Sequence, residues 1–291
     1  MPELPEVEVI RRGIERLVAG RRISRVRITR DSHVFLTKPA SLKRTLVGRE
    51  VLGIARRGKY LLVRLDDGKR LMLHLGMTGQ LISRQAAGRR SRPTSRRSRS
   101  RPEGREGVQA DKHTHLILSF GDQGPEVLFR DVRKFGRVCL LPAGHSNSRL
   151  DRLGIDALEA SGEDLFQASR SRKVAVKTLL LNQALIAGVG NIYADEALFQ
   201  ARIRPTRRAG RLTRRDCQVL MGSVKQVLMR AITTGGSSIS DFVASDGSSG
   251  SYQREHQVYG RGGKPCGACG ESIRKITVGQ RAAHYCPRCQ R

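Results

Sequence analysis

Residues 173–205 read KVAVKTLLLNQALIAGVGNIYADEALFQARIRP, two apolar segments with helical spacing on either side of a glycine-rich turn. The pattern predicts two helices joined at Gly188-Val189-Gly190-Asn191, with Asn191 as the N-cap of the second helix. Glycines let backbone amides approach a ligand closely, and a helix N-terminus attracts phosphate. The turn therefore indicates either a packing device or a phosphate site. The polar side chains that such a site would use are Arg172, Lys173, Lys177, Asn191 and Tyr193.

The chain on the N-terminal side of this stretch is rich in predicted strands, and the chain after about residue 151 is mainly helical. Apolar spacing predicts two further helices, over residues 6–19 and 213–234. The strand predictions are a hairpin turning at Asp66-Asp67-Gly68, a second hairpin within residues 115–129 and a single strand at residues 136–142. We therefore expect a mainly β first half followed by a helical second half.

The composition favours a polyanionic partner. Lys and Arg number 55 against 26 Asp and Glu, which gives the 291 residues a formal net charge of +29. A surplus of this size attracts nucleic acid, the commonest polyanion inside cells. A membrane surface is the competing polyanion, but no apolar run reaches the roughly 18–20 residues that a spanning helix needs. The absence of Trp argues against a sugar-binding or aromatic-cage surface.

The N-terminus does not fit a signal peptide, because it has prolines and acids where a basic stretch and an apolar run should be. We therefore expect a cytoplasmic, nucleoid-associated protein. Residues 84–110 form an Arg/Ser/Gly/Pro tract that cannot bury a core and should be disordered. Eight arginines within residues 89–105 make the tract either a solvated loop or a non-specific DNA tether.

Two CxxC pairs form the strongest single motif of the chain, and they comprise Cys266, Cys269, Cys286 and Cys289. Four thiolates in two knuckles suit one tetrahedral Zn²⁺, and a closed set of ligands leaves no position for a reactive water, so the metal is structural. The residues between the pairs predict a hairpin around Val278-Gly279-Gln280. Arg281 then lies near the tip, where it is either solvated or aimed at a phosphate. Cys139 and Cys217 are isolated and are expected to be buried thiols.

Two short segments of the β half carry side chains that suit a wedge. HLGMTG contains His74 and Met77, and RDVRKFG contains Arg133 and Phe135. Proteins that act on a base within duplex DNA must flip it out, and they insert apolar or cationic side chains into the vacated stack. Each of these residues taken alone is more typical of an ordinary core or surface position.

The first eight residues, MPELPEVE, combine two prolines with three acids. Initiator Met before Pro is normally removed, which would expose the secondary amine of Pro2. An α-amino group has a pKa near 7.7–8, so roughly 10% of it is neutral at pH 7 and nucleophilic. Glu3 could then act as a general acid or base, with Glu6 to position it. The alternative is a plain acidic helix start, because Glu3, Glu6 and Glu8 lie at the positive end of the helix dipole.

Taken together, these segments resemble the formamidopyrimidine-DNA glycosylase family. PELPEVE, RRGKYLL, HLGMTG, DVRKFG, GVGNIYADEALF, SDG before QVYGRGGKPC, and QRAAHYCPRCQ occur in the order found in that family. The resemblance implies an α+β fold with an N-terminal helix and β-sandwich, then a helix–two-turn–helix domain and a four-cysteine zinc finger. It implies domains at residues 1–150, 151–255 and 256–291, with a lesion-capping loop at about 236–252. Double-stranded DNA would lie in the cleft between the domains, bound by a monomer.

The resemblance also implies the chemistry. Pro2 would attack C1′ of a flipped oxidised purine nucleotide, with Glu3 as proton donor and Glu6 in support. Lys59 would serve β-elimination and Arg281 δ-elimination, which leaves a one-nucleotide gap. Positions that match DNA contacts, including the wedge that fills the vacated stack, are His74, Met77, His113, Arg133, Phe135, Arg172, Lys173, Lys177, Asn191 and Tyr193.

Two alternatives remain at this stage. The related endonuclease VIII branch acts on oxidised pyrimidines, but it typically opens with PEGPE and lacks the Arg-x-Phe wedge, so PELPE and RKF favour the purine-excising branch. A non-catalytic zinc-finger protein that binds DNA would also be basic and cytosolic. The tract at residues 84–110 is longer and more basic than the usual connection in the family.

Overall fold

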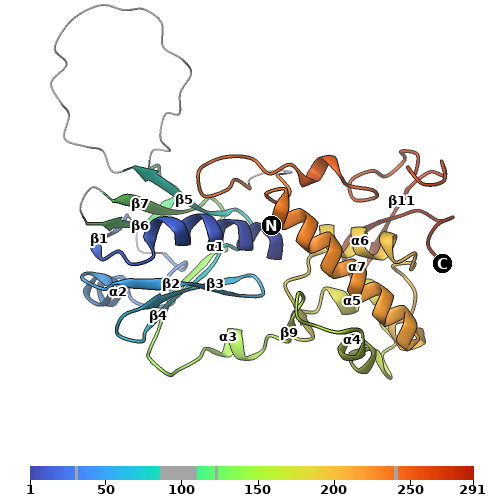
Figure 1. Ribbon diagram of the computed structural model, residues 1–291, viewed down its shortest axis with the longest axis horizontal. Helices are drawn as coiled ribbons and strands as arrows, with labels where there is room; N and C mark the ends of the chain where they lie inside the picture. The colour runs from blue at the N-terminus through green and yellow to red at the C-terminus, as the bar shows by residue number, and fades with distance from the viewer. Residues whose placement is uncertain (30–31, 86–109, 122–123, 239–241) are drawn as a thin grey trace, which may run out of the picture.

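The computed structural model describes residues 1–29, 32–85, 110–121, 124–238 and 242–291. Most of the predicted Arg/Ser tract therefore lies outside the described residues. The molecule has two halves placed side by side, with strands in the first and helices in the second (Figure 1). The N-terminus lies where the two halves meet, and the C-terminus lies at the far end of the helical half. The expected α+β fold class is confirmed.

The first half is a sandwich of two four-stranded antiparallel sheets. One sheet has the order β1-β6-β7-β5, from Ile23–Ile28, Thr114–Phe120, Pro125–Asp131 and Gly79–Gln85. The other has the order β2-β3-β4-β8, from Val51–Arg57, Tyr60–Leu65, Arg70–His74 and Arg137–Leu141. The pairs β3–β4 and β6–β7 confirm both predicted hairpins, and β8 confirms the predicted strand. A short helix, α2 (Pro39–Leu46), packs beside β1.

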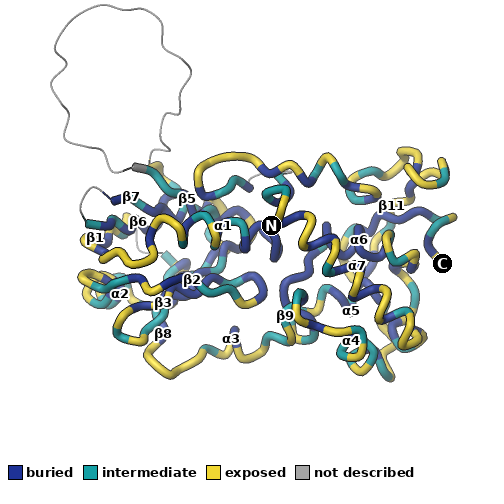
Figure 2. The backbone as a smooth tube through the Cα atoms, in the orientation of Figure 1, coloured by how far each residue is buried: buried dark blue, intermediate teal, exposed yellow. Residues whose placement is uncertain are grey.

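Helix α1 (Leu4–Val18) places its apolar stripe in the core of the sandwich. Val7, Ile10 and Ile14 are buried there at the spacing of one helix face. The helix begins two residues before the predicted start at residue 6, because Pro5 is compatible with a first turn and Glu6 accepts the backbone N–H of Glu3. The whole segment 2–8 is buried, so the N-terminal turn is enclosed between the halves (Figure 2).

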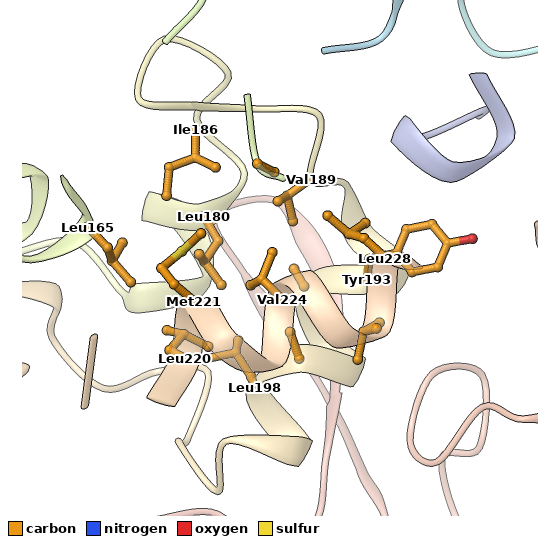
Figure 3. Packing of buried hydrophobic residues seen from close by; sticks show 14 of the residues in the cluster. Leu165, Leu180, Ile186, Val189, Tyr193, Leu198, Leu220, Met221, Val224 and Leu228 are labelled. Atoms are coloured by element: carbon orange, nitrogen blue, oxygen red, sulfur yellow. The ribbon is translucent and has the colours of Figure 1, made fainter. Parts of the chain in front are cut away.

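The second half is built from short elements around one long helix. They are α3 (Ser148–Asp151), β9 (Ile155–Asp156), α4 (Gly162–Ser169), α5 (Val176–Leu180), β10 (Ile186–Ala187), α6 (Asn191–Gln200), the 3-10 turn η1 (Ala209–Arg211) and α7 (Arg214–Thr233). Helix α7 confirms the prediction for residues 213–234. The central cluster packs α6 and α7 against α4 and α5, and Tyr193 stands at its edge with the hydroxyl pointing away (Figure 3).

The turn between α5 and α6 differs from the prediction in two respects. Helix α5 spans only five residues. Gln183 then bridges the turn, because its Oε1 accepts the N–H of Gly188 at 2.9 Å and its Nε2 donates to the carbonyl of Val189 at 2.8 Å. The N-cap of α6 is Gly190, and Asn191 is already the first helical residue.

The C-terminal segment forms a further, separate antiparallel hairpin of two short strands. Its strands are β11 (Arg274–Val278) and β12 (Arg281–Tyr285), which turn at Gly279 and Gln280 as predicted. A 3-10 turn, η2 (Tyr252–Arg254), precedes it. Across the described ranges, no helix is both long enough and apolar enough to cross a membrane.

Candidate active site

The N-terminal turn of α1 is held by the glycine-rich turn of the second half. The N–H of Leu4 donates to the carbonyl of Gly188 at 3.2 Å, and the N–H of Ile192 donates to Oε1 of Glu3 at 3.0 Å. The anion at the N-terminus of α6 is therefore the Glu3 carboxylate of the same chain. A helix N-terminus favours such a group through its free N–H groups and its dipole.

Both glycines of the turn are required by this contact. A Cβ on Gly188 would lie 2.4 Å from Cδ1 of Leu4, and one on Gly190 would lie 2.2 Å from Cδ of Glu3. Gly188 also has a φ of +112°, which a residue with a side chain rarely adopts. Of the two predictions for this turn, a packing device or a phosphate site, these contacts fit the packing device, because the glycines make room for the N-terminal turn.

Glu3 has the chemistry of a proton carrier near neutral pH. It is only 3% exposed, and burial raises its pKa to about 7, against the opposing charge of Lys59 and with the help of Glu6. Its Oε1 accepts the Ile192 N–H, whereas Oε2 has no hydrogen-bond partner among the described residues. Oε2 can therefore carry a proton that is not engaged in a hydrogen bond with another group of the described residues.

Glu6 links Glu3 to the segment that follows α7. Its Oε2 accepts the N–H of Glu3 at 2.8 Å, and its Oε1 accepts the N–H of Ser237 at 2.9 Å and the hydroxyl of Tyr193. Tyr193 is buried, and burial followed by Glu6 and Glu3 raises its pKa well above the ordinary value. The interpretation of Tyr193 as a phosphate contact is wrong, because its hydroxyl is used inside the protein. Ser237, which sequence reasoning missed, also approaches Nε2 of His256 at 3.1 Å.

Lys59 lies at the tip of the β2–β3 turn and faces the same acids. It is 7% exposed, and burial lowers its pKa, with Glu3 and Glu6 opposing the shift and Arg281 adding to it. In the part of the chain that the structure describes, its ammonium makes no hydrogen bond or ion pair. An amine of lowered pKa gives up its proton more readily than an ordinary lysine. Arg281, on the zinc-finger hairpin, is exposed but close enough to act on Lys59.

The turn that carries Lys59 is fastened by Arg56. This guanidinium binds Asp156 of the second half at 2.6 and 3.2 Å and Glu8 of α1 at 3.1 Å. Asp156 also accepts the N–H of Gly58 at 3.0 Å. Arg56 lies in the RRGKYLL segment, but neither it nor Asp156 was assigned a role from the sequence, since their contact joins residues 100 positions apart.

Two loops of the sandwich present the expected wedge residues together. Met77 and Phe135 are 36% and 47% exposed, and Cζ of Arg133 lies 4.8 Å from the centre of the Phe135 ring. Gly76 is in contact with the backbone at Phe135, where a Cβ would lie 2.5 Å from the carbonyl carbon. The loops thus form one projection of apolar and cationic side chains.

Asp131 holds this projection and was not singled out from the sequence. It is fully buried, accepts the hydroxyl of Thr78 at 2.6 Å, and accepts the N–H groups of Arg133 and Gly136 at 3.2 and 2.7 Å. A carboxylate that accepts several bonds in this way fixes the loop around it.

The remaining expected DNA contacts are either at least partly exposed or, in the case of Lys177, fully buried. His113 and Asn191 are partly exposed, and Arg172 and Lys173 are exposed. His74 is partly exposed too, but burial, followed by Lys59, lowers its pKa to about 4, so its imidazole is neutral at pH 7. The interpretation of Lys177 as a phosphate contact is wrong. Its side chain is 0% exposed, and its Nζ binds Asp195 at 2.6 Å and the carbonyl of Ala282 at 2.5 Å.

The four cysteines of the two CxxC pairs converge at the C-terminus. Their sulfur atoms all lie within 4.8 Å of one another, and no other group of this kind occurs among the described residues. This spacing suits four thiolates around one Zn²⁺, and it confirms the predicted structural zinc site. The predicted burial of Cys139 and Cys217 is also confirmed.

An N-terminal helix on a β-sandwich, a helix–two-turn–helix half and a four-cysteine finger define a DNA glycosylase. Three family models divide the chain accordingly: the formamidopyrimidine-DNA glycosylase N-terminal domain over residues 1–138, the H2TH domain of the same glycosylase over residues 153–243, and the zinc finger found in FPG and IleRS over residues 263–291. The chain belongs to the formamidopyrimidine-DNA glycosylase family.

Individual relatives agree over the full length. Formamidopyrimidine-DNA glycosylases of Burkholderia thailandensis and Thioalkalivibrio sulfidiphilus are 44% and 42% identical, and the match covers 100% of this chain and of each relative. Among solved structures, complexes of the Lactococcus lactis enzyme with DNA that contains Fapy-dG or an abasic site have TM-scores of 0.83. They are 34% and 33% identical to this chain, with 100% of both chains covered.

Proposed function

We propose that this glycosylase excises oxidised purines, 8-oxoguanine and formamidopyrimidines, from double-stranded DNA and then cleaves the strand by β- and δ-elimination. Family membership and the DNA complexes of the Lactococcus lactis relative support the substrate class. The observation that carries the mechanism is the enclosed N-terminal turn, where Glu3 has a pKa of about 7 and a free carboxyl oxygen. We further propose that the protein acts in the cytoplasm, on nucleoid DNA.

The chemistry begins once Met1, which is 51% exposed, has been removed. The Pro2 nitrogen attacks C1′ of the extruded nucleotide, the bond to the base breaks, and the base leaves with the proton that the amine gives up. The C1′–O4′ bond then opens to form the iminium, and O4′ takes a proton from Oε2 of Glu3. Glu6 fixes the turn by accepting the N–H of Glu3 at 2.8 Å. A general acid with a pKa near the working pH is the most effective, and its contribution is typically about 10²–10⁴-fold.

The iminium between Pro2 and C1′ then promotes both eliminations. Loss of a proton from C2′ breaks the C3′–O3′ bond, and loss of a proton from C4′ breaks the C5′–O5′ bond. Lys59, whose pKa burial lowers, is placed to serve the first step. Arg281 is a cation for the phosphate that leaves in the second step, since a guanidinium forms strong charge-assisted bonds with phosphate.

The rest of the molecule holds the DNA. Met77, Arg133 and Phe135 fill the vacated stack, and the segment at 236–252, of which residues 239–241 lie outside the described residues, caps the extruded base. The phosphates around the lesion are contacted by His74, His113, Arg172, Lys173 and Asn191. The domains span residues 1–150, 151–255 and 256–291, and their cleft takes the duplex.

Borohydride trapping on a duplex that contains 8-oxoguanine opposite cytosine tests this proposal. We expect a covalent adduct with the processed chain and none with a chain whose N-terminal tag blocks the Pro2 amine. A Lys275→Met chain, altered on the exposed face of β11, serves as a matched control and should be trapped normally. An adduct that persists in the blocked chain would refute the role of Pro2. Absence of any adduct would support the alternative function, a non-catalytic protein that binds DNA.

The choice of lesion is tested separately. On matched duplexes, excision of 8-oxoguanine should be faster than excision of an oxidised pyrimidine under single-turnover conditions. The reverse order would favour an activity like that of endonuclease VIII.

A further inference from the structure

Lys177 occupies a position that the proposed chemistry does not use. It lies on α5, which belongs to the helical half, yet its ammonium reaches the zinc-finger hairpin. There it donates to the carbonyl of Ala282 at 2.5 Å and to Oδ1 of Asp195 at 2.6 Å. Lys177 and Asp195 are buried, and Ala282 is partly exposed. A buried ammonium needs such partners.

Both carboxylate oxygens of Asp195, the partner of Lys177, have hydrogen-bond partners. Its Oδ2 accepts the N–H of His284 at 2.9 Å and approaches Nδ1 of the same residue at 3.2 Å. The carboxylate of one α6 residue therefore binds strand β12 directly at His284 and, through Lys177, at Ala282. These bonds fasten the strand on both sides of Ala283.

The tip of the hairpin has a second contact with α5. A Cβ on Gly279 would lie 2.7 Å from Oγ1 of Thr178, the residue that follows Lys177. Gly279 and Gln280 both have positive φ, of 54° and 62°, so the turn has a defined shape. Arg281 stands between the residue that touches Thr178 and the residue whose carbonyl binds Lys177.

We infer that Lys177, together with Asp195, is a positioning residue for Arg281. Consecutive residues of α5 hold the backbone on either side of Arg281 and set where its exposed guanidinium projects toward Lys59. This inference rests on the proposed function, in which Arg281 serves δ-elimination. A displacement of about 1 Å at a reacting group can lower a rate by up to about 100-fold. Lys177 would thus govern the second strand cleavage and leave the first largely unaffected.

The test compares the two cleavages in single turnovers on a 5′-labelled duplex with an abasic site. The variant carries Lys177→Met and Asp195→Asn together, so that no charge is left buried without a partner. The amide oxygen introduced by the second substitution can still accept the His284 N–H. We expect the ratio of δ- to β-elimination ends to fall about tenfold or more, while the rate of the borohydride-trapped β step changes less than about twofold.

Three controls decide the interpretation. Lys275→Met, the same substitution at an exposed lysine of β11, should leave the ratio unchanged. The zinc content of each variant is measured by native mass spectrometry and should be one per chain. Arg281→Ala should lower the ratio by itself, and adding the double substitution to it should lower the ratio no further.

The possible outcomes are distinguishable. An unchanged ratio in the zinc-loaded double variant overturns the inference. A parallel fall of both cleavages with loss of zinc overturns it too, because the pair would then only stabilise the finger. A further fall in the Arg281→Ala background would show that Lys177 does not act through Arg281. If the unmodified chain forms no adduct at all, the proposed function fails, which is a different result from a changed ratio.

Discussion

Two buried glutamates, Glu3 at the N-cap of α1 and Glu8 within the helix, have opposite electrostatics. Glu3 accepts the backbone N–H of Ile192 and makes no ion pair among the described residues, and burial raises its pKa to about 7. Burial alone would also raise the pKa of Glu8, but hydrogen bonds from Arg11, Arg12 and Arg56 outweigh it and lower the pKa to about 2. The same residue type is therefore poised to give up a proton near neutral pH at one site and is charged at neutral pH at the other.

The difference teaches how this helix divides its work. A carboxylate bound by several guanidiniums is stabilised as a charge and serves packing, and here it joins α1 to Arg56 at the junction of the two halves. A carboxyl group without such partners destabilises the fold in its charged form, and that penalty is what makes it a proton donor. Activity and stability should consequently respond in opposite ways at the two positions.

The largest effect is expected for Glu3→Gln. Gln keeps the acceptor for the Ile192 N–H and removes the titrating proton, so excision should fall about 100-fold or more. Stability should rise by about 1–2 kcal/mol at pH 8. The folded chain holds a proton on Glu3 between about pH 4.5 and 7 that the unfolded chain has lost, so wild-type stability falls as the pH rises through that window. Single-turnover excision and urea unfolding measure the two quantities. Near-normal excision in this variant would show that Glu3 is not the proton donor.

Glu8→Gln should give the converse result. The folded pKa of Glu8 lies below its ordinary value, so its stabilisation is present above about pH 4.5 and is lost as the pH falls toward about 2. Replacement should lower the free energy of unfolding by about 2–3 kcal/mol at pH 7, because three arginines lose their shared partner. Excision per folded molecule should stay within about threefold of the wild-type rate. A large loss of excision at full stability would contradict the division of work.

The contrast between Glu3 and Glu8 also shows which features of the molecule could be predicted from the sequence. Periodicity and turn residues are local, so they predicted α1, α7, both hairpins and the zinc finger. The pairing of Glu3 with Glu6 could be predicted too, since three residues separate them on one helix. The contacts of Glu6 with Tyr193 and of Arg56 with Asp156 join residues 187 and 100 positions apart, and no local pattern carries them.

Some chemical expectations failed for the same reason. Lys177 lies in a basic run beside a glycine-rich turn, and that setting is typical of a phosphate contact. Its burial depends on β12, which lies about 105 positions away. The glycines of the turn were predicted to be either a packing device or a phosphate site, and the group that they admit is the N-terminal turn. Side-chain type indicated where chemistry occurs, whereas only the packing showed which partner each group has.

The pH dependence of excision sharpens the assignment of Glu3. The protonated fraction of Glu3 falls as the pH rises through about 7. The neutral fraction of the Pro2 amine increases as the pH approaches the pKa of an α-amino group, about 7.7–8. The product of the two fractions gives a bell with its maximum between about pH 7 and 8 and a decline of about tenfold per unit on either side. Glu3→Gln should lose the alkaline decline. Rates measured from pH 5.5 to 9.5 on one duplex would show it, and an alkaline limb retained in the variant would point to another acid.

The smallest effect is expected at His256, at the far end of the hydrogen-bonded chain that runs through Ser237 to Glu6. Burial lowers the pKa of His256 to about 4, so the unfolded chain binds a proton between about pH 6.5 and 4 that the folded chain does not. Wild-type stability is therefore lost as the pH falls through this window. His256→Gln keeps an acceptor for the Ser237 hydroxyl. Between pH 7 and pH 5, the free energy of unfolding of this variant should fall by about 1 kcal/mol less than that of the wild type. Urea unfolding at the two pH values measures it. An unchanged pH dependence would show that the imidazole is solvated, and the chain from Glu6 would then end at Ser237.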